Sequence, residues 1–243
     1  MRRVGGRSDG AFGRTRGRAL ARTAFRALRA WYRPRLPLAP HRCPRCRFPA
    51  PGCLCAAVPR VRSRVEVVFL RHVSERGRLT NTGHWASLAL EGSSVLEHGV
   101  VGEPLDVSRL DAAGAWLLFP SPHPPPRDAP PPLRLIVPDG TWAQARRIVQ
   151  RVPEIRTLPR LAVEVAVPDA LRLRRPLVLG GMSTLEAVAA ALRALGEVEA
   201  ADALDALHRD GVALATRLGG GPGRGSPPGS RTGAPPARRS ARG

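Results

Sequence analysis

Hydrophobic and polar positions between residues 64 and 218 follow two alternating patterns. Mainly apolar runs at residues 65–70 and 133–137 predict buried strands, residues 115–119 form a further apolar run that ends at a proline, and residues 160–167 alternate as a strand does. Four further segments carry apolar side chains at helical spacing: residues 83–90, 143–152, 182–195 and 200–218. Because strands and helices alternate along the chain, we expect an α/β domain built on a mostly parallel sheet.

Composition divides the 243-residue chain into four parts. Residues 1–40 form an Arg-rich tail and residues 219–243 a tail rich in Gly, Pro and Arg, and we expect both to be disordered. Between them lie residues 41–60, which hold all four cysteines, and the α/β domain at residues 61–218. The N-terminal tail is either a functional segment that binds phosphate or a low-complexity extension, which includes a start site placed too early.

The formal net charge of +20 is concentrated in the two tails. Residues 1–36 carry 11 arginines and one acid, and residues 217–243 carry six arginines and no acid. Residues 37–216 hold 22 arginines and 18 acids, so the part expected to fold is only mildly basic. The tails are suited to binding RNA phosphates, and biased composition without function is the alternative.

The chain offers no signal for a membrane or for secretion. It contains no apolar run of 18 residues, and its basic N-terminus lacks the apolar region of a secretory signal. We therefore expect a cytoplasmic protein without a stable protein partner. An Arg-rich organellar transit peptide is an alternative that the low Ser content of the N-terminus disfavours.

The four cysteines lie within 13 residues, in a C-x2-C pair followed by a C-x-C pair: Cys43, Cys46, Cys53 and Cys55. In a cytosolic protein this spacing favours a tetrahedral zinc site over disulfides. Four thiolates leave no open coordination position, so the zinc would be structural rather than catalytic. Two disulfides or four free thiols are the alternatives.

An acid, a hydroxyl and an indole follow the second predicted strand in the tetrapeptide Asp139-Gly140-Thr141-Trp142. A turn between a strand and a helix is where α/β proteins bind ligands, because it exposes backbone N–H groups and a helix N-terminus. The local alternative is a turn in which Thr141 caps the helix and Trp142 lies in the core. Capping leaves Asp139 unexplained, because Thr141 already serves as the cap.

Two further polar segments precede predicted helices. In the segment Thr80-Asn81-Thr82-Gly83, Asn81 or Thr82 is a candidate N-cap. Ser183 and Thr184 follow two glycines, and Ser183 can form a capping box with Glu186. A helix N-terminus with two hydroxyls would also suit a ligand carboxylate.

These motifs occur in a fixed order along the chain: C-x2-C…C-x-C, T-N-T-G at 80–83, D-G-T-W at 139–142, L-P-R-L at 158–161 and S-T-L-E-A at 183–187. Together they resemble the DTW-domain family, the tRNA-uridine aminocarboxypropyltransferases, from Cys43 to about Ala190. The chain departs from the family pattern twice. Val73 follows His72 where a proline is expected, and residues 171–174 lack an expected aromatic residue.

The resemblance implies a SPOUT-like, knotted α/β fold and a transferase that acts on tRNA. Such enzymes move the 3-amino-3-carboxypropyl group of S-adenosylmethionine to N3 of a uridine and release methylthioadenosine. Asp139 would be the base, or the acceptor that orients the N3–H group. The cofactor would be bound by Leu158, Leu161, Arg174, Ser183 and Thr184. The RNA would be bound by Arg71, Thr80, Asn81, Thr82 and Trp142, with Arg76 and Arg78 assisting Arg71 at phosphates.

Two other functions fit the same residues. One is a SPOUT-type RNA methyltransferase that uses the same cofactor. The other is a non-catalytic zinc protein that binds RNA, in which Asp139 and Ser183 have only capping roles. The sequence leaves open which uridine is modified and whether the substrate is tRNA or rRNA.

Overall fold

The computed structural model describes residues 42–110, 113–122, 129–164, 173 and 181–218. Five strands form one sheet in the order β2-β1-β4-β3-β5, and every neighbouring pair is parallel. The strands are β1 (Glu66–His72), β2 (Ser94–His98), β3 (Ala115–Leu118), β4 (Arg134–Asp139) and β5 (Arg160–Leu161). The predicted α/β architecture with a parallel sheet is therefore confirmed.

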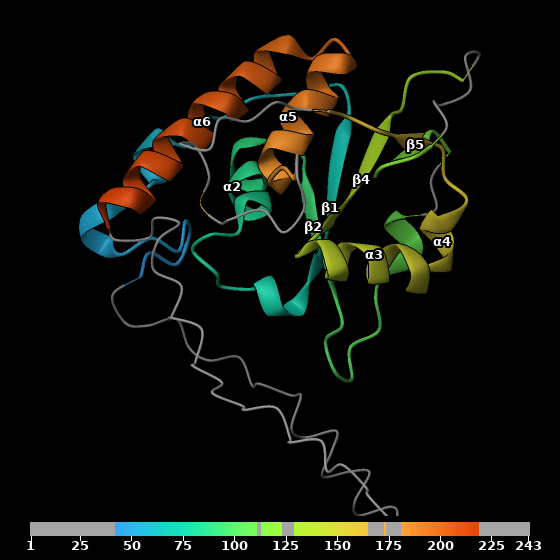
Figure 1. The fold of residues 1–243 in the computed structure, drawn as a ribbon, viewed down its shortest axis with the longest axis horizontal. Coiled ribbons are helices and arrows are strands. Elements are labelled where there is room, and N and C mark those ends of the chain that lie inside the picture. The colour runs from blue at the N-terminus through green and yellow to red at the C-terminus, as the bar shows by residue number, and fades with distance from the viewer. Residues whose placement is uncertain (1–41, 111–112, 123–128, 165–172, 174–180, 219–243) are drawn as a thin grey trace, which may run out of the picture.

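Helices cover both faces of the sheet (Figure 1). One face carries α2 (Thr82–Ala89), α5 (Thr184–Ala194) and α6 (Val198–Arg217). The other carries α3 (Trp142–Arg151) and the one-turn helix α4 (Pro153–Arg156). Four 3₁₀ turns are also described: η1 (Ala50–Gly52), η2 (Cys55–Ala57), η3 (Val73–Glu75) and η4 (Val107–Arg109). Both faces of the sheet are covered, which explains why the centres of β1 and β4, at residues 67–70 and 135–138, are apolar and buried.

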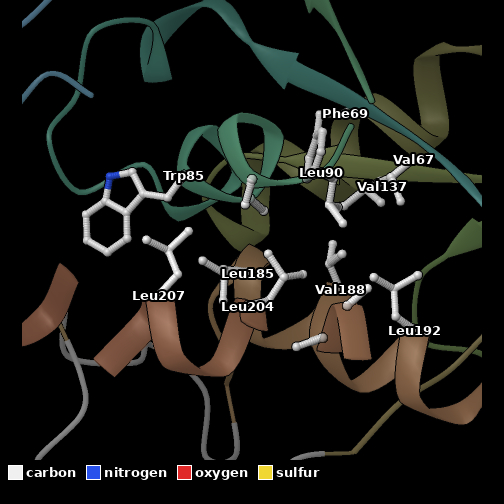
Figure 2. Close-up of a cluster of buried hydrophobic side chains, with 14 of the residues drawn as sticks. Val67, Phe69, Trp85, Leu90, Val137, Leu185, Val188, Leu192, Leu204 and Leu207 are labelled. Carbon is white, nitrogen blue, oxygen red and sulfur yellow. The ribbon is translucent and has the colours of Figure 1, made fainter. Parts of the chain in front are cut away.

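The larger core lies between the sheet and the α2, α5 and α6 layer (Figure 2). Phe69 and Val137 project from the sheet toward Leu185 and Val188 of α5. Trp85 of α2 extends this cluster toward Leu207 of α6. Burying one such leucine or valine stabilises a fold by about 1.5–3 kcal/mol, so this layer holds α5 and α6 against the sheet.

The cysteine segment belongs to the same core. Cys46, Phe48 and Leu54 are fully buried within the cluster that contains Trp85. The Phe48 and Trp85 ring centroids are 5.4 Å apart. The segment therefore packs on α2, so its conformation can influence the start of that helix.

The expected elements differ from the observed ones in three places. Strand β2 was not predicted, because its residues are only partly buried at the sheet edge and two of its five are Glu97 and His98. Strand β4 continues through Pro138, so that Asp139 is the last strand residue rather than part of the turn. Of the predicted strand at 160–167, Arg160–Leu161 is a strand and the residues after 164 lie outside the described part. Among the helices of the described residues, none has both the length and the hydropathy needed to cross a membrane.

Candidate functional site

The carboxyl ends of the parallel strands meet at one edge of the sheet, where α/β proteins bind their ligands. Asp139 ends β4, beside Arg71 in the pairing register with β1. Helices α2 and α5 both begin at this edge, after their N-caps Asn81 and Ser183. Three segments that the sequence marked separately therefore lie together.

Asp139 connects the three segments. Asn81 donates from Nδ2 to Asp139 Oδ2 at 2.7 Å, and Thr184 donates from Oγ1 to Asp139 Oδ1 at 2.8 Å. The Asp139 side chain is buried, with 3% of the residue exposed. Burial raises the pKa of Asp139, and the two hydrogen bonds offset only part of that effect. The result is a carboxylate that accepts a proton more readily than an exposed aspartate.

Gly83 allows Asp139 to lie against the first turn of α2. A Cβ atom at position 83 would lie 2.6 Å from Asp139 Oδ1, which is too close for any side chain. Glycine is among the poorest helix formers, so a glycine inside a short helix indicates a close approach of this kind. The sequence marked Gly83 only as a motif member and did not reveal this role.

Each helix start at this edge is capped as predicted. Asn81 accepts from the backbone N–H of His84, while Thr141 and Ser183 form capping boxes with Gln144 and Glu186. Thr82 does not cap α2. Its hydroxyl accepts from the backbone N–H of Leu185 at 3.5 Å and so joins α2 to α5.

The arginines expected at phosphates all contact carboxylates. Arg71 forms an ion pair with Glu97 of β2, and its side chain is only 12% exposed. Arg76 approaches Glu97 at 3.4 Å, and Arg78 approaches Glu75 at 3.2 Å. These partners neutralise much of the charge that the prediction assigned to phosphate binding.

The residues expected at adenosine are not all brought together. Leu158 packs with the core on the α3 face of the sheet, whereas Leu161 packs with the core on the opposite face. Arg174 lies outside the described residues. Thr80, expected to contact RNA, occupies the turn that immediately precedes the cap of α2.

Trp142 is not a core residue, so the local alternative for this side chain is wrong. It is 40% exposed and stacks on Phe119, with ring centroids 5.2 Å apart and planes 6° from parallel. Arg146 lies over the Trp142 ring at 5.9 Å, and Arg160 lies over the Phe119 ring at 5.8 Å. This aromatic pair sits where β3 ends and α3 begins, and sequence reasoning missed its second member.

Two histidines lie near Asp139 on the α3 face of the sheet. Their ring centroids are 6.2 Å apart: His72 ends β1 and His98 ends β2. Burial lowers the pKa of both, so each is mainly neutral at pH 7. A Cβ atom on Gly140 would lie 3.4 Å from the His72 Cβ, which places His72 beside the tetrapeptide.

The four cysteine sulfurs have the spacing of a metal site. All lie within 4.8 Å of one another, with Cys43 to Cys55 and Cys46 to Cys53 at 3.6 Å. Sulfurs placed tetrahedrally about one zinc would be about 3.8 Å apart, whereas a disulfide joins sulfurs at about 2.05 Å. Backbone N–H groups of Cys46 and Arg45 lower the pKa of Cys43 to about 6, whereas burial raises the pKa of Cys55 to about 12. The cluster fits zinc, and the disulfide alternative is wrong.

The cysteine segment is connected to the Asp139 site through His84. The ring of His84, kept mainly neutral because burial lowers its pKa, donates from Nε2 to the Arg45 carbonyl at 2.7 Å. The backbone N–H of the same residue donates to Asn81, which in turn donates to Asp139. A change in the cysteine segment can thus reach Asp139 through three consecutive contacts.

Comparison with known proteins points to one family. The profile of the DTW domain matches residues 40–212. A protein of Drosophila melanogaster named tRNA-uridine aminocarboxypropyltransferase 2 is 30% identical over 173 residues, covering 64% of this chain and 66% of its own length. The chain thus spans just under two thirds of that relative. No solved structure matches at a significant level.

Proposed function

The chain belongs to the DTW-domain family, and from this premise we propose that it is a tRNA-uridine aminocarboxypropyltransferase. It would transfer the 3-amino-3-carboxypropyl group of S-adenosylmethionine to N3 of a uridine in tRNA and release methylthioadenosine. The name of the fly relative supports the substrate and the group transferred. The convergence of Asn81, Thr184 and Asp139 at the carboxyl edge of the sheet supports the location of the reaction.

The reaction requires removal of one proton and exchange of one bond. The electron pair of the uridine N3–H bond forms the new bond from N3 to the Cγ of the donor. The bond between that carbon and the sulfonium breaks, its electron pair stays on sulfur, and methylthioadenosine leaves as a neutral thioether. Asp139 accepts the N3 proton, and its raised pKa suits it to this step.

The remaining residues position the two substrates. We assign the donor carboxylate to Ser183, Thr184 and the N-terminus of α5, because helix N-termini attract anions. Adenosine is assigned to Leu158, Leu161 and Arg174. Thr80, Asn81 and Thr82 would contact the uracil edge or the ribose.

The finer architecture is part of the same proposal. Residues 61–218 would form a SPOUT-like, knotted domain, and residues 41–60 a knuckle around a structural zinc bound by the four cysteines. Such an ion would hold the segment that packs on α2, and it would take no part in the transfer because four thiolates fill its coordination shell. The tails would be disordered, and the protein would act in the cytoplasm.

A double-label assay tests the reaction. The full chain is incubated with bulk tRNA and S-adenosylmethionine labelled in either the carboxyl carbon or the methyl group. We expect the carboxyl label to enter RNA and the methyl label to remain in methylthioadenosine. Transfer of the methyl label alone would identify a methyltransferase, and no cofactor binding in calorimetry would identify a non-catalytic RNA-binding protein.

Two variants test the assignment of the base. Replacing Asp139 with Asn should slow transfer by about 10²- to 10⁴-fold, the usual contribution of a general base, with unchanged cofactor affinity. Replacing His72 with Asn removes a second proton acceptor at this edge of the sheet and should leave the rate within a few fold. The reverse result would assign the base to His72.

A further inference from the structure

We propose that the exposed face of α3, with Arg146, Arg147 and Arg151, is the surface on which the RNA backbone docks. The inference rests on the proposed function, because it takes RNA as the substrate. It replaces the expectation that Arg71, Arg76 and Arg78 hold the phosphates.

The folded part contains two strongly basic stretches, residues 42–64 and the α3 region at residues 140–161. Residues 42–64 carry six arginines and no acid, but three of the six form ion pairs with Glu91 and Glu197. Residues 140–161 contain five arginines and one acid, Glu154. Residues 37–216 as a whole have an excess of only four arginines over acids, 22 against 18. The α3 stretch alone has an excess of four arginines over acids. A polyanion such as RNA is the partner that this distribution attracts.

The α3 arginines retain their charge, whereas many other arginines are paired. Within the described part of the chain, Arg146, Arg147 and Arg151 make no ion pair, and all three are exposed. Other described arginines pair with acids: Arg60, Arg62, Arg64, Arg71, Arg76, Arg78, Arg109, Arg134 and Arg193. A phosphate that binds at α3 therefore displaces no carboxylate.

The aromatic pair orders part of this surface without neutralising it. Arg146 lies over the Trp142 ring and Arg160 over the Phe119 ring, and the two rings stack on each other. A contact between a guanidinium and a ring restricts the side chain but leaves its full charge and its N–H donors available. The pair is thus a platform that presents arginines to phosphates, and Trp142 itself remains 40% exposed.

The surface adjoins the proposed reaction site. Trp142 lies three positions after Asp139, at the start of the helix that carries the arginines. Arg147 and Arg151 also act on the sheet edge: after burial, their charges contribute to lowering the pKa of His72 and His98 respectively. An RNA strand held along α3 would therefore pass the carboxyl ends of β1, β2 and β4.

The test compares two double variants of the full chain with equal loss of charge. One is Arg147→Gln with Arg151→Gln. The control is Arg60→Gln with Arg62→Gln, whose side chains are 78% and 89% exposed and lie beside the C-terminal end of α2. Because both variants retain the Arg-rich tails, any binding by the tails is common to them.

Affinity for bulk tRNA is measured against salt concentration, together with cofactor affinity and the KM for tRNA. Each lost phosphate contact makes the negative slope of log K against log salt shallower by about 0.7 to 0.9. The α3 variant loses two contacts, so its slope should be shallower than that of the wild type by about 1.4 to 1.8. We expect a several-fold higher KM for tRNA, unchanged cofactor affinity, and wild-type values for the control. Equal salt slopes in the wild type and the α3 variant, or an equal loss in the control, overturn the inference.

The design separates this inference from the proposed function. If the wild type transfers no carboxyl label but the α3 variant loses tRNA affinity, the docking surface stands and the reaction is wrong. If transfer occurs and the α3 variant changes neither the salt slope nor the KM, the docking surface alone is wrong. If the α3 variant binds tRNA as the wild type does but no longer binds an acidic protein, the α3 surface serves a protein partner and the docking of RNA there is wrong.

Discussion

Replacing Gly83 with Ala tests whether the position of Asp139 controls the reaction. The added methyl group would lie 2.6, 2.7 and 2.9 Å from three atoms of the Asp139 carboxylate. Ordinary contacts of a Cβ atom begin at 3.4 Å, so the carboxylate or the helix must move by about 0.8 Å. The hydrogen bonds from Asn81 and Thr184, now 2.7 and 2.8 Å, would stretch or break.

The expected effect on activity is larger than the effect on stability. Misplacing a reacting group by about 1 Å slows an enzyme by about 10²-fold, so we expect a loss of that order in the rate of carboxyl-label transfer. Overpacking costs about 1–3 kcal/mol of folding free energy, and alanine recovers about 1 kcal/mol relative to glycine in a helix. The net loss of stability, measured by denaturant unfolding, should therefore be about 0–2 kcal/mol.

Replacing Gly211 with Ala is the matched control. A Cβ atom there would lie 2.4 Å from the Trp85 ring, so this variant also overpacks a helix, but without touching Asp139. It should lose stability and keep its transfer rate where it is folded. A cycle with Asp139→Asn adds a second check: if Gly83→Ala acts through Asp139, the double variant is no slower than Asp139→Asn alone. If the rate losses of Gly83→Ala and Asp139→Asn multiply in the double variant, or if Gly83→Ala alone keeps the wild-type rate, Gly83 does not act through the position of Asp139.

Three further predictions follow from the same contacts. Burial raises the pKa of Asp139 above its ordinary 3.8, so protonation of this carboxyl stabilises the folded state. This stabilisation is complete below pH 3.8 and is lost as the pH rises through the raised pKa. Asp139→Asn should therefore unfold at an equal or higher temperature at pH 7 and depend less on pH above 3.8 in thermal melts; a large loss of stability would contradict this. Thr184→Val keeps volume but removes one donor to Asp139, and should slow transfer several-fold while Thr184→Ser restores it; equal rates in the two variants would make the hydroxyl irrelevant. Purified protein should contain one zinc per chain by elemental analysis. Removal of the zinc should lower the melting temperature, because the cysteine segment contributes Phe48 and Leu54 to the core. A metal-free protein with four titratable thiols, whose melting temperature a chelator does not change, would contradict this.

The fold could be predicted where the apolar pattern was strong and failed where polar residues interrupted it. Strands β1 and β4 and helices α3, α5 and α6 are regular segments, and the capping residues Thr141 and Ser183 mark where α3 and α5 begin. Strand β2 has the polar residues Glu97 and His98 because it lies at the sheet edge, so its pattern was too weak to detect. That omission had a consequence, because Glu97 is the acid that pairs with Arg71. Because the prediction lacked β2, it left Arg71 without an acidic partner and therefore assigned it to a phosphate.

The site could be predicted as segments but not as contacts. Asp139 lies 58 residues from Asn81 and 45 from Thr184, and no local pattern indicates which polar groups meet across such separations. The parallel sheet determines which polar groups meet, because it brings the ends of β1 and β4 to the same edge as the first turns of α2 and α5. Gly83 was equally hidden, since its role depends on a carboxylate from another strand.

Asn81 can cap a helix and serve the site at the same time, because the oxygen and the nitrogen of its side-chain amide contact different partners. Its Oδ1 accepts from His84 and starts α2, while its Nδ2 donates to Asp139. Asn81→Asp separates the two roles: aspartate caps a helix as well as asparagine does, but it places a second carboxylate beside the first. The pair would share a proton, which raises the apparent pKa of one group further and leaves the other ionised. We expect retained helix content, lower stability at neutral pH, and a pH–rate profile displaced to higher pH. Asn81→Ser keeps a cap without the added charge and should show a smaller displacement in the same direction, because it loses only the hydrogen bond that lowers the pKa of Asp139. A wild-type profile for Asn81→Asp would mean that Asn81 serves α2 alone and that Asp139 does not depend on it.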